Sequence, residues 1–321
     1  MLKINQDFLD KIKKVNLSFR QKYKSTNIDK YSIRQKMSES DVDIRQIPTF
    51  DNESLSIWLG GGLLGAVDGS VNQTKGEPPH LIYFFQALAK TTTGYECFVS
   101  DVYFPLLDDE RTEEEEREDS KKKRSHLLAK QELTAAYQLI EEQNLKVLMM
   151  DGALYHYRID APLEWEKLKE KALAERVFLV GVSEEITTSN LVRLEAFQSL
   201  KQSGYTYDRD LLFGVLHQGE AIYIEEIQHK AGLQSVWMRL GADPQITGFD
   251  MLDEQAEHKW EMSRLLATLT PKNGRGIPFW LDHIDREVRV TDKLVEALVE
   301  QYIDPELKQR FLSKKREGRP Y

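Results

Sequence analysis

The sequence predicts an α/β protein in which a mixed sheet carries helices on its faces. Three adjoining segments are dense in aromatic and β-branched residues, which indicates an antiparallel meander. They cover 57–67, 81–89 and 95–104. Helical patterns then alternate with short apolar runs of the kind that form buried strands. The expected helices are 126–144, 163–175 and 187–203, with strands at 145–152 and 176–183. A meander followed by this alternation favours one sheet with antiparallel and parallel parts.

The same element order is that of the ribonuclease H-like fold. Residues 1–48 are polar with a thin apolar stripe, so we expect an N-terminal helical arm. Residues 49–300 form the main domain, with later strands expected at 211–227 and 235–241 and closing helices around 274–288. Residues 301–321 are expected to be a basic C-terminal tail.

Bulk composition narrows the class of protein. No apolar stretch approaches the ~18 to 20 residues that span a bilayer, and the first residues lack the apolar core of a signal peptide. We therefore expect a cytoplasmic protein with no membrane contact. One cysteine, Cys97, leaves no disulfide framework and no cysteine-based zinc site. A net charge of −9 disfavours nucleic-acid binding, but basic runs at 121–124 and 313–320 leave room for a local basic groove.

Two apolar runs end in the same dipeptide, Asp-Gly. The first reads LLGAVDGS and contains Asp68, and the second reads KVLMMDGAL and contains Asp151. One interpretation is a hairpin turn, because type I′ turns favour Asp-Gly. At Asp68 the polar stretch 71–80 argues against a returning strand. At Asp151 the segment ALYHYRI leaves the turn open. The other interpretation is a carboxylate at the end of each strand.

The predicted order favours the second interpretation. The strands that carry Asp68 and Asp151 are the first and fourth of the sheet, which lie side by side in this fold. The helix between them holds Glu132, which faces both acids if it points inward; the alternative is a solvated helix glutamate. Carboxylates that share a site repel one another. Mg²⁺ or Mn²⁺ relieves that repulsion, and two such ions can promote phosphodiester cleavage.

These motifs together resemble the NurA family of nucleases. The similar segments read AVDGS, LMMDGAL, FLVGVSEEITTSNL and GIPFWLDHIDREVRV, with a helical glutamate before the second. The resemblance implies a ribonuclease H-like core related to the Piwi domain. It implies a manganese-dependent DNA nuclease that forms a homodimer and works with HerA, a hexameric ATPase that translocates DNA. The metal ligands would be Asp68, Glu132 and Asp151.

The C-terminal motif matches the family less closely. By resemblance Asp285 takes the position of a fourth metal ligand, and it is preferred to His283, which lies two residues earlier and so faces elsewhere on a helix. Ile277 stands where the family has a tyrosine. Glu184 stands where the family tends to have a lysine, which reverses the charge there.

Further residues are candidates for DNA or cleft contacts. These are Ser70, His156, Arg158, Arg239 and His283. Arg239 is of interest because a guanidinium can bind a phosphate through two hydrogen bonds. For each the competing interpretation is an ordinary structural or surface residue.

The sequence therefore predicts a metal-dependent DNA nuclease that acts on single strands and DNA ends, in repair or in defence. One rival is a structural or regulatory partner of a HerA-type ATPase whose site has decayed, which Ile277 and Glu184 suggest. A second rival has the same fold but cuts RNA or hybrid duplexes, because nothing in the sequence reports the 2′-hydroxyl choice.

Overall fold

The computed structural model describes residues 5–24, 29–40, 42–107, 115–198 and 207–312. Its strands are β1 (Asp43–Gln46), β2 (Leu63–Gln73), β3 (Tyr83–Thr91), β4 (Glu96–Tyr103), β5 (Leu145–Asp151), β6 (Phe178–Ser183), β7 (Glu220–Tyr223), β8 (His229–Lys230), β9 (Leu233–Met238) and β10 (Thr247–Leu252). Within the described ranges they form one mixed sheet in the order β1-β7-β9-β10-β6-β5-β2-β3-β4, with β8 paired to β9.

The sheet confirms the predicted fold class. Strands β2, β3 and β4 form the antiparallel meander, and β5 and β6 pair in parallel. Strand β2 pairs in parallel with β5, so the first and fourth strands of the predicted core are neighbours. Strands β7, β9 and β10 extend the sheet beyond β6 with antiparallel pairs. This is the ribonuclease H-like arrangement that the element order indicated.

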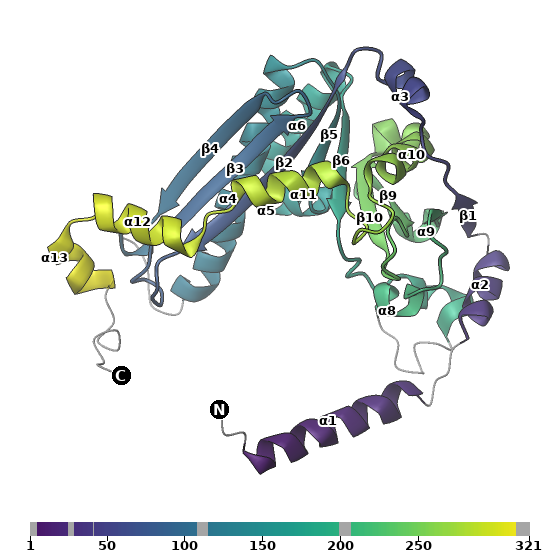
Figure 1. Ribbon diagram of the computed structural model, residues 1–321, viewed down its shortest axis with the longest axis horizontal. Coiled ribbons are helices and arrows are strands. Elements are labelled where there is room, and N and C mark those ends of the chain that lie inside the picture. The colour runs from purple at the N-terminus through teal and green to yellow at the C-terminus, as the bar shows by residue number, and fades with distance from the viewer. Residues whose placement is uncertain (1–4, 25–28, 41, 108–114, 199–206, 313–321) are drawn as a thin grey trace.

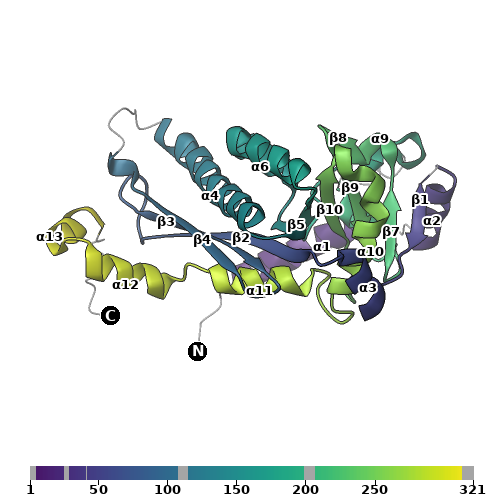
Figure 2. The same cartoon turned by 90° about the horizontal axis from the view of Figure 1, so that it is seen from above.

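Helices cover both faces of the sheet (Figures 1 and 2). The helices are α1 (Gln6–Lys24), α2 (Lys30–Ser38), α3 (Asn52–Leu59), α4 (Glu115–Glu142), α5 (Leu154–Asp160), α6 (Pro162–Ala174), α8 (Asp208–Leu212), α9 (Glu225–Gln228), α10 (Lys259–Leu269), α11 (Phe279–Val288), α12 (Asp292–Tyr302) and α13 (Pro305–Leu307). Figure 2 shows α4 and α6 on one face and α11 on the other. None of the helices in the described ranges has the length and apolar character needed to cross a bilayer.

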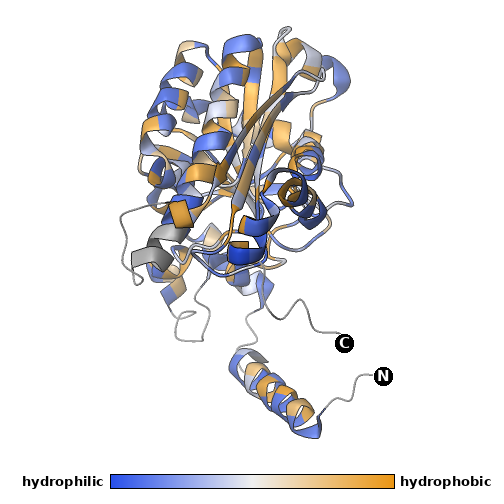
Figure 3. Ribbon diagram, turned by 90° about the vertical axis from the view of Figure 1, so that its left-hand side faces the viewer, coloured by the Kyte–Doolittle hydropathy of each residue, from blue (hydrophilic) through white to orange (hydrophobic). Residues whose placement is uncertain are grey.

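Each face has its own apolar core. On the α4 face, Leu133 and Leu139 pack with Met150 of β5. On the α11 face, Leu281 and Ile284 pack in a second cluster that includes Ala66 of β2. The spacing of three residues between 281 and 284 puts both on one side of α11. Figure 3 shows many apolar residues in the sheet, and helices in which apolar and polar stretches alternate.

The N-terminal region differs from the predicted helical arm. Helix α1 lies apart from the sheet, as an arm would (Figures 1 and 3). Helix α2, however, buries Ile33 and Met37 in an apolar cluster of the main body. Strand β1 then joins the sheet at β7. Residues 30–46 therefore belong to the folded body, because α2 supplies core side chains that the thin stripe in the sequence did not reveal.

Several predicted boundaries also move. Residues 57–59 end α3, which stops where Gly60 adopts a φ of 59°, so the strand expected at 57–67 begins only at Leu63. The same strand continues to Gln73, which places Asp68 inside β2 and not at its end. The helix expected at 187–203 is replaced by two short 3₁₀ turns, and part of that prediction lies outside the described residues. Strand β7 covers only a short part of the strand expected at 211–227.

The C-terminal region is more ordered than the predicted tail. Helix α12 runs to Tyr302 and α13 follows it, so residues up to 312 are largely helical. The basic stretch at 313–320 lies outside the described residues. Much of the acidic run at 107–119 also lies outside them.

The ion pair between Arg34 of α2 and Glu220 of β7 gives a first testable prediction. Arg34 donates from Nη1 and Nη2 to the two carboxylate oxygens of Glu220, at 2.6 and 2.9 Å, and both side chains are largely buried. We expect Arg34→Ala to lower the free energy of unfolding by about 1.5 to 3 kcal/mol, because it leaves a charged acceptor without its partner. Urea denaturation followed by circular dichroism measures this.

The matched control is Lys75→Ala. Lys75 pairs with Glu296 at 2.7 Å on the exposed surface. We expect a change of about 0.5 kcal/mol or less there, since exposed pairs contribute little. Equal losses in the two variants would contradict the view that Arg34 anchors α2.

Candidate active site

Two aspartates meet where β2 and β5 run side by side. Val67 of β2 pairs with Met150 of β5, and the next residue in each strand is Asp68 and Asp151. Paired strands lie about 4.8 Å apart, so the two acids are neighbours. Asp68 is inside a strand and Asp151 is the last residue of one, so neither belongs to a hairpin turn. The segment after Asp151 forms α5 and is not a returning strand.

The surroundings of these two acids disfavour their ionised forms. Asp68 is 8% exposed, and one of its carboxylate oxygens accepts a hydrogen bond from the backbone N–H of Gly69 at 2.7 Å. Burial, reinforced by the charge of Asp151, raises the pKa of Asp68 to about 7. Burial and the charge of Asp285 raise the pKa of Asp151 to about 6. When both are ionised, the carboxylates of Asp68 and Asp151 therefore carry more negative charge than the surrounding groups balance.

Glu132 approaches from the helix that packs on the opposite face. It is buried on α4, 7% exposed, and lies directly against Gly69. A Cβ at position 69 would overlap the Glu132 Oε1 atom and lie 2.7 Å from its Cγ. Burial and the charges of Asp68 and Asp151 raise the pKa of Glu132 to about 8. Gly69 is therefore needed to make room for Glu132.

Tyr157 is a site residue that the sequence did not single out. It is buried on α5, and its hydroxyl donates a hydrogen bond to the backbone carbonyl of Asp151 at 3.0 Å. Glu132 is the second acceptor near this hydroxyl and competes with that carbonyl for its one proton, and this interaction counteracts part of the rise in the pKa of Glu132. Tyr157 thus lies between the Glu132 carboxylate and the backbone at the end of β5. The sequence held one signal for it, because Leu154 and Tyr157 are three residues apart and so share one side of a helix. Both are buried in the structure.

Asp285 lies close enough to influence the same site. It is on α11, its charge raises the pKa of both Asp68 and Asp151, and one of its oxygens accepts from Arg289 at 2.7 Å. The four acids predicted from the sequence are therefore brought into one region. Their role in holding a metal stays a prediction. In the part of the chain that the structure describes, no three His, Cys, Asp or Glu side chains are gathered closely enough to hold a metal ion.

The acids are not gathered more closely because they lie on the two different faces of the sheet. Successive side chains of a strand point to opposite faces, so Asp68 shares the α11 face with Ala66 while position 69 faces α4 and Glu132. The donor set fits a divalent cation in its chemistry, since all its members are carboxylates whose charges oppose one another.

Two of the further candidates have structural partners. The hydroxyl of Ser70 accepts a hydrogen bond from the backbone N–H of Val290 at 3.0 Å, which ties β2 to the end of α11. Arg239 donates to three backbone carbonyls at 2.9 to 3.0 Å, those of Leu216, Ala242 and Asp243. Arg239 therefore holds loops together through these bonds, and its contact with DNA stays a prediction.

The remaining contact candidates, His156, Arg158 and His283, lie on helices α5 and α11. His156 and Arg158 are exposed on α5, and Arg158 donates to the carbonyl of Ala231. His283 pairs with Glu287 at 3.1 Å. Ile277, at the position of the family tyrosine, is buried in the core of the α11 face. The structure describes all of these residues and shows no hydrogen bond or ion pair between them and the predicted acids Asp68, Glu132, Asp151 and Asp285.

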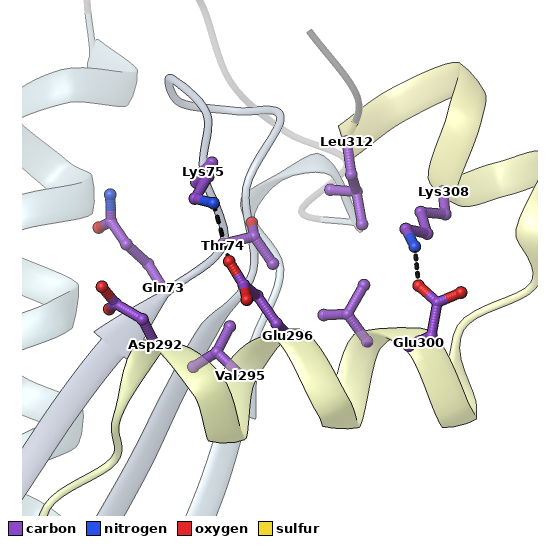
Figure 4. A pocket seen from close by; sticks show the side chains of 10 residues that line it. Gln73, Thr74, Lys75, Asp292, Val295, Glu296, Glu300, Lys308 and Leu312 are labelled. Atoms are coloured by element: carbon purple, nitrogen blue, oxygen red, sulfur yellow. Dashed lines mark hydrogen bonds and ion pairs between the residues drawn. The ribbon is translucent and has the colours of Figure 1, made fainter. Parts of the chain in front are cut away.

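A well-formed pocket lies elsewhere. It lies between the end of β2, helix α12 and the π-helical turn Lys308–Leu312 (Figure 4). Its volume is about 380 Å³. Its rim carries two ion pairs, Lys75 with Glu296 and Lys308 with Glu300. None of the four predicted acids lines this pocket. This pocket and the predicted acids are therefore separate places on the molecule.

Sheet order and acid placement define the class: a ribonuclease H-like α/β protein with acids on two adjacent parallel strands. The chain belongs to the NurA nuclease family, since the NurA domain model matches residues 62–290. None of the curated proteins compared with this sequence matches it.

Two crystal structures resemble the whole chain. The NurA nuclease from Sulfolobus solfataricus is 16% identical with a TM-score of 0.60, over 96% of this chain and 98% of that one. Another NurA structure is 10% identical with a TM-score of 0.52, over 94% of this chain and 99% of that one. At these identities the likeness establishes the shared fold.

The contact between Gly69 and Glu132 gives a second testable prediction. Gly69→Ala should lower the free energy of unfolding by about 1 to 3 kcal/mol, because the new methyl group overlaps the Glu132 side chain. In a Glu132→Ala background the same substitution should cost much less. A double-mutant cycle by urea denaturation measures the coupling. An equal cost of Gly69→Ala in both backgrounds would show that Glu132 does not occupy this space.

The raised pKa of Asp68 gives a third prediction. The folded-state pKa of about 7 lies above the ordinary 3.8, so the metal-free chain should lose stability as the pH rises from about 4 to about 7. At pH 8 in EDTA, Asp68→Asn should therefore be about 1 to 3 kcal/mol more stable than the parent chain, because it removes an unbalanced buried charge. Thermal or urea unfolding across this pH range measures both effects.

The control for this measurement is Asp210→Asn. Asp210 lies in an exposed position beside Arg209, so its replacement should leave the pH dependence of stability unchanged. If Asp68→Asn were less stable than the parent chain at pH 8, the charge of Asp68 would not be unbalanced.

Proposed function

We propose that this chain is a divalent-metal-dependent deoxyribonuclease that hydrolyses phosphodiester bonds with two bound Mn²⁺ or Mg²⁺ ions. The observation that carries the proposal is that three elements bring Asp68, Asp151 and Glu132 into one region, with the aspartates on neighbouring strands and Glu132 packed against Gly69 from the other face of the sheet. Each of these acids has a pKa raised by burial and by the charge of another acid. Membership in the NurA family supports the same activity.

Each residue of the site has a part in this proposal. Asp68, Glu132 and Asp151 would hold the ions, with Asp285 as a fourth carboxylate. Bound divalent ions supply activation of water and stabilisation of the leaving oxygen in phosphodiester hydrolysis. Tyr157 keeps Glu132 and the end of β5 in a fixed relation through its hydroxyl. No covalent intermediate with the protein is needed.

The substrate and partners are part of the proposal. Single strands and DNA ends suit a site that recognises phosphate and not base edges. We further propose that the chain acts as a homodimer and with a HerA-type hexameric ATPase, in processing DNA ends for repair or in defence. Membership in the NurA family supports both partners as proposals.

A second candidate function is that of a catalytically weakened partner of such an ATPase. One observation favours it: among the described residues, the acids are not gathered closely enough to hold a metal. The buried state of Asp68 and Glu132 argues against it, since acids with no use in a core are costly to keep.

A cleavage assay tests the proposal and gives a fourth prediction. Labelled single-stranded DNA, duplex DNA and RNA are incubated with the chain in Mn²⁺, Mg²⁺ or EDTA. We expect metal-dependent cutting of DNA that falls by at least about 100-fold in Asp68→Asn and in Asp151→Asn. Loss of a residue beside a metal ligand already costs 10- to 100-fold, and loss of a ligand should cost more.

The control variant is Asp210→Asn, which should cut like the parent chain. Thermal unfolding confirms that the Asn variants are folded. Cutting in EDTA, or full activity in both Asn variants, would overturn the metal-dependent mechanism. Folded protein without cutting would favour the weakened partner, and preferential cutting of RNA would change the substrate.

A further inference from the structure

A guanidinium is held at the edge of the carboxylate site by a loop of fixed shape. Arg275 lies in the loop between α10 and α11. The hydroxyl of Thr247 donates to the carbonyl of Gly276 at 3.0 Å. A Cβ at Gly241 would overlap the carbonyl oxygen of Gly274 and lie 2.7 Å from the backbone nitrogen of Gly276. The loop is therefore packed on the sheet as closely as glycine allows, and the backbone of Arg275 has little freedom.

The side chain of Arg275 is oriented by two acids from different elements. Its Nη1 donates to Glu184, which follows β6, at 2.6 Å. Its Nη2 and Nε donate to one oxygen of Asp282 on α11, at 2.6 and 3.1 Å. A guanidinium has five N–H donors, and these bonds use three of them. The Arg275 side chain is 49% exposed, so a ligand can reach it from solvent.

Arg275 is also close to the predicted catalytic acids. Burial and the charges of Asp285, Glu184 and Asp282 raise the pKa of Asp151, and the charge of Arg275 lowers it. Asp151 ends β5 beside β6, the strand that leads to Glu184. A cation therefore stands at the border of a strongly acidic region, where a polyanion would otherwise be repelled.

We propose that Arg275 binds a backbone phosphate of the nucleic-acid substrate, and that Glu184 and Asp282 hold it ready to do so. This inference rests on the proposed nuclease function. The geometry suits the task because the planar guanidinium can present two parallel N–H groups to phosphate oxygens. A fixed loop and two anchoring acids reduce the conformational entropy lost on binding. Glu184 positions Arg275 but also competes with the phosphate for it, so Glu184 limits the affinity for the phosphate.

The alternative is that Arg275 only ties the end of β6 to α11. The two roles make opposite predictions for Glu184→Gln. If the ion pair is purely structural, Arg275→Gln and Glu184→Gln change DNA binding no more than the same charge changes do at an exposed ion pair elsewhere on the chain, and Arg275→Gln leaves the salt dependence unchanged. A phosphate contact makes Arg275→Gln weaken binding, whereas Glu184→Gln frees the guanidinium from a competing acid and strengthens it.

Fluorescence anisotropy with the full chain tests this and gives the fifth prediction. Labelled single-stranded oligonucleotide is titrated in EDTA, so that no cutting occurs, over a series of salt concentrations. We expect Arg275→Gln to weaken binding by roughly tenfold and to reduce the slope of log affinity against log salt by about 0.7, the value for one phosphate contact on a single strand. Arg275→Lys should keep part of the affinity, and Glu184→Gln should bind severalfold more tightly.

The chain offers a matched control in the next ion pair. Arg209 pairs with Glu185, and these side chains are 44% and 48% exposed. Arg209→Gln and Glu185→Gln make the same charge changes without altering the carboxylate site. We expect each to change affinity by about twofold or less. Thermal unfolding of all variants separates loss of fold from loss of contact.

The outcomes separate this inference from the proposed function. If Arg275→Gln binds like Arg209→Gln with an unchanged salt slope, or if Glu184→Gln weakens binding as Arg275→Gln does, the phosphate contact is overturned. If the parent chain binds in an Arg275-dependent way but cuts nothing in Mn²⁺ or Mg²⁺, the contact stands and the nuclease proposal falls. If the parent chain does not bind nucleic acid, both fall.

Discussion

The candidate site depends on one irregularity in the parallel pairing of β2 with β5. Near the start of this pairing β5 contains one extra residue, Lys146. Without it the register would set Asp68 level with Met150, which is buried on the α4 face. With it, Asp68 is level with Asp151. Because a shift of one residue turns every side chain to the opposite face, this irregularity determines whether two acids meet. Gly62 makes room for it, since a Cβ there would lie 2.9 Å from the Cβ of Lys146.

The repeated Asp-Gly dipeptide serves two different purposes. In β2 it lies within the strand, so Asp68 faces α11 while Gly69 leaves space for Glu132 from α4. Here the glycine is required by a side chain on the other face of the sheet. In β5 the dipeptide ends the strand, and Gly152 takes a φ of 106°, which lets the chain turn into α5. The turn after Asp151 delivers Tyr157 back to the carbonyl of Asp151. The Asp-Gly dipeptide thus positions Asp68 and Asp151 in two different ways.

The sequence predicted the centre of the sheet and placed the acids in one region, but it did not predict strands β1, β8 and β10 or the groups that hold the acids. Segments dense in aromatic and β-branched residues predicted the meander. The element order predicted that the first and fourth strands are neighbours, and from that order Glu132 could be placed near Asp68 and Asp151. The position of Asp68 inside β2 was missed, because a polar stretch was taken as the end of a strand that in fact continues along the sheet. Arg275 was also missed, since its partners are 91 and 7 residues away along the chain. Contacts of that kind leave no periodic pattern in the sequence.

The electrostatics of the site connect its stability to its proposed chemistry. Asp68, Glu132 and Asp151 have pKa values of about 7, 8 and 6, so near neutral pH protons supply part of the missing positive charge. A divalent cation would compete with those protons for the same oxygens, and its binding would release them. Binding of the cation would then offset the free energy that it costs to keep these acids buried. A chain of net charge −9 can accept a polyanion at such a site only where local cations reverse the sign of the field. Bound metal within the site and a tethered guanidinium at its border would together meet that requirement.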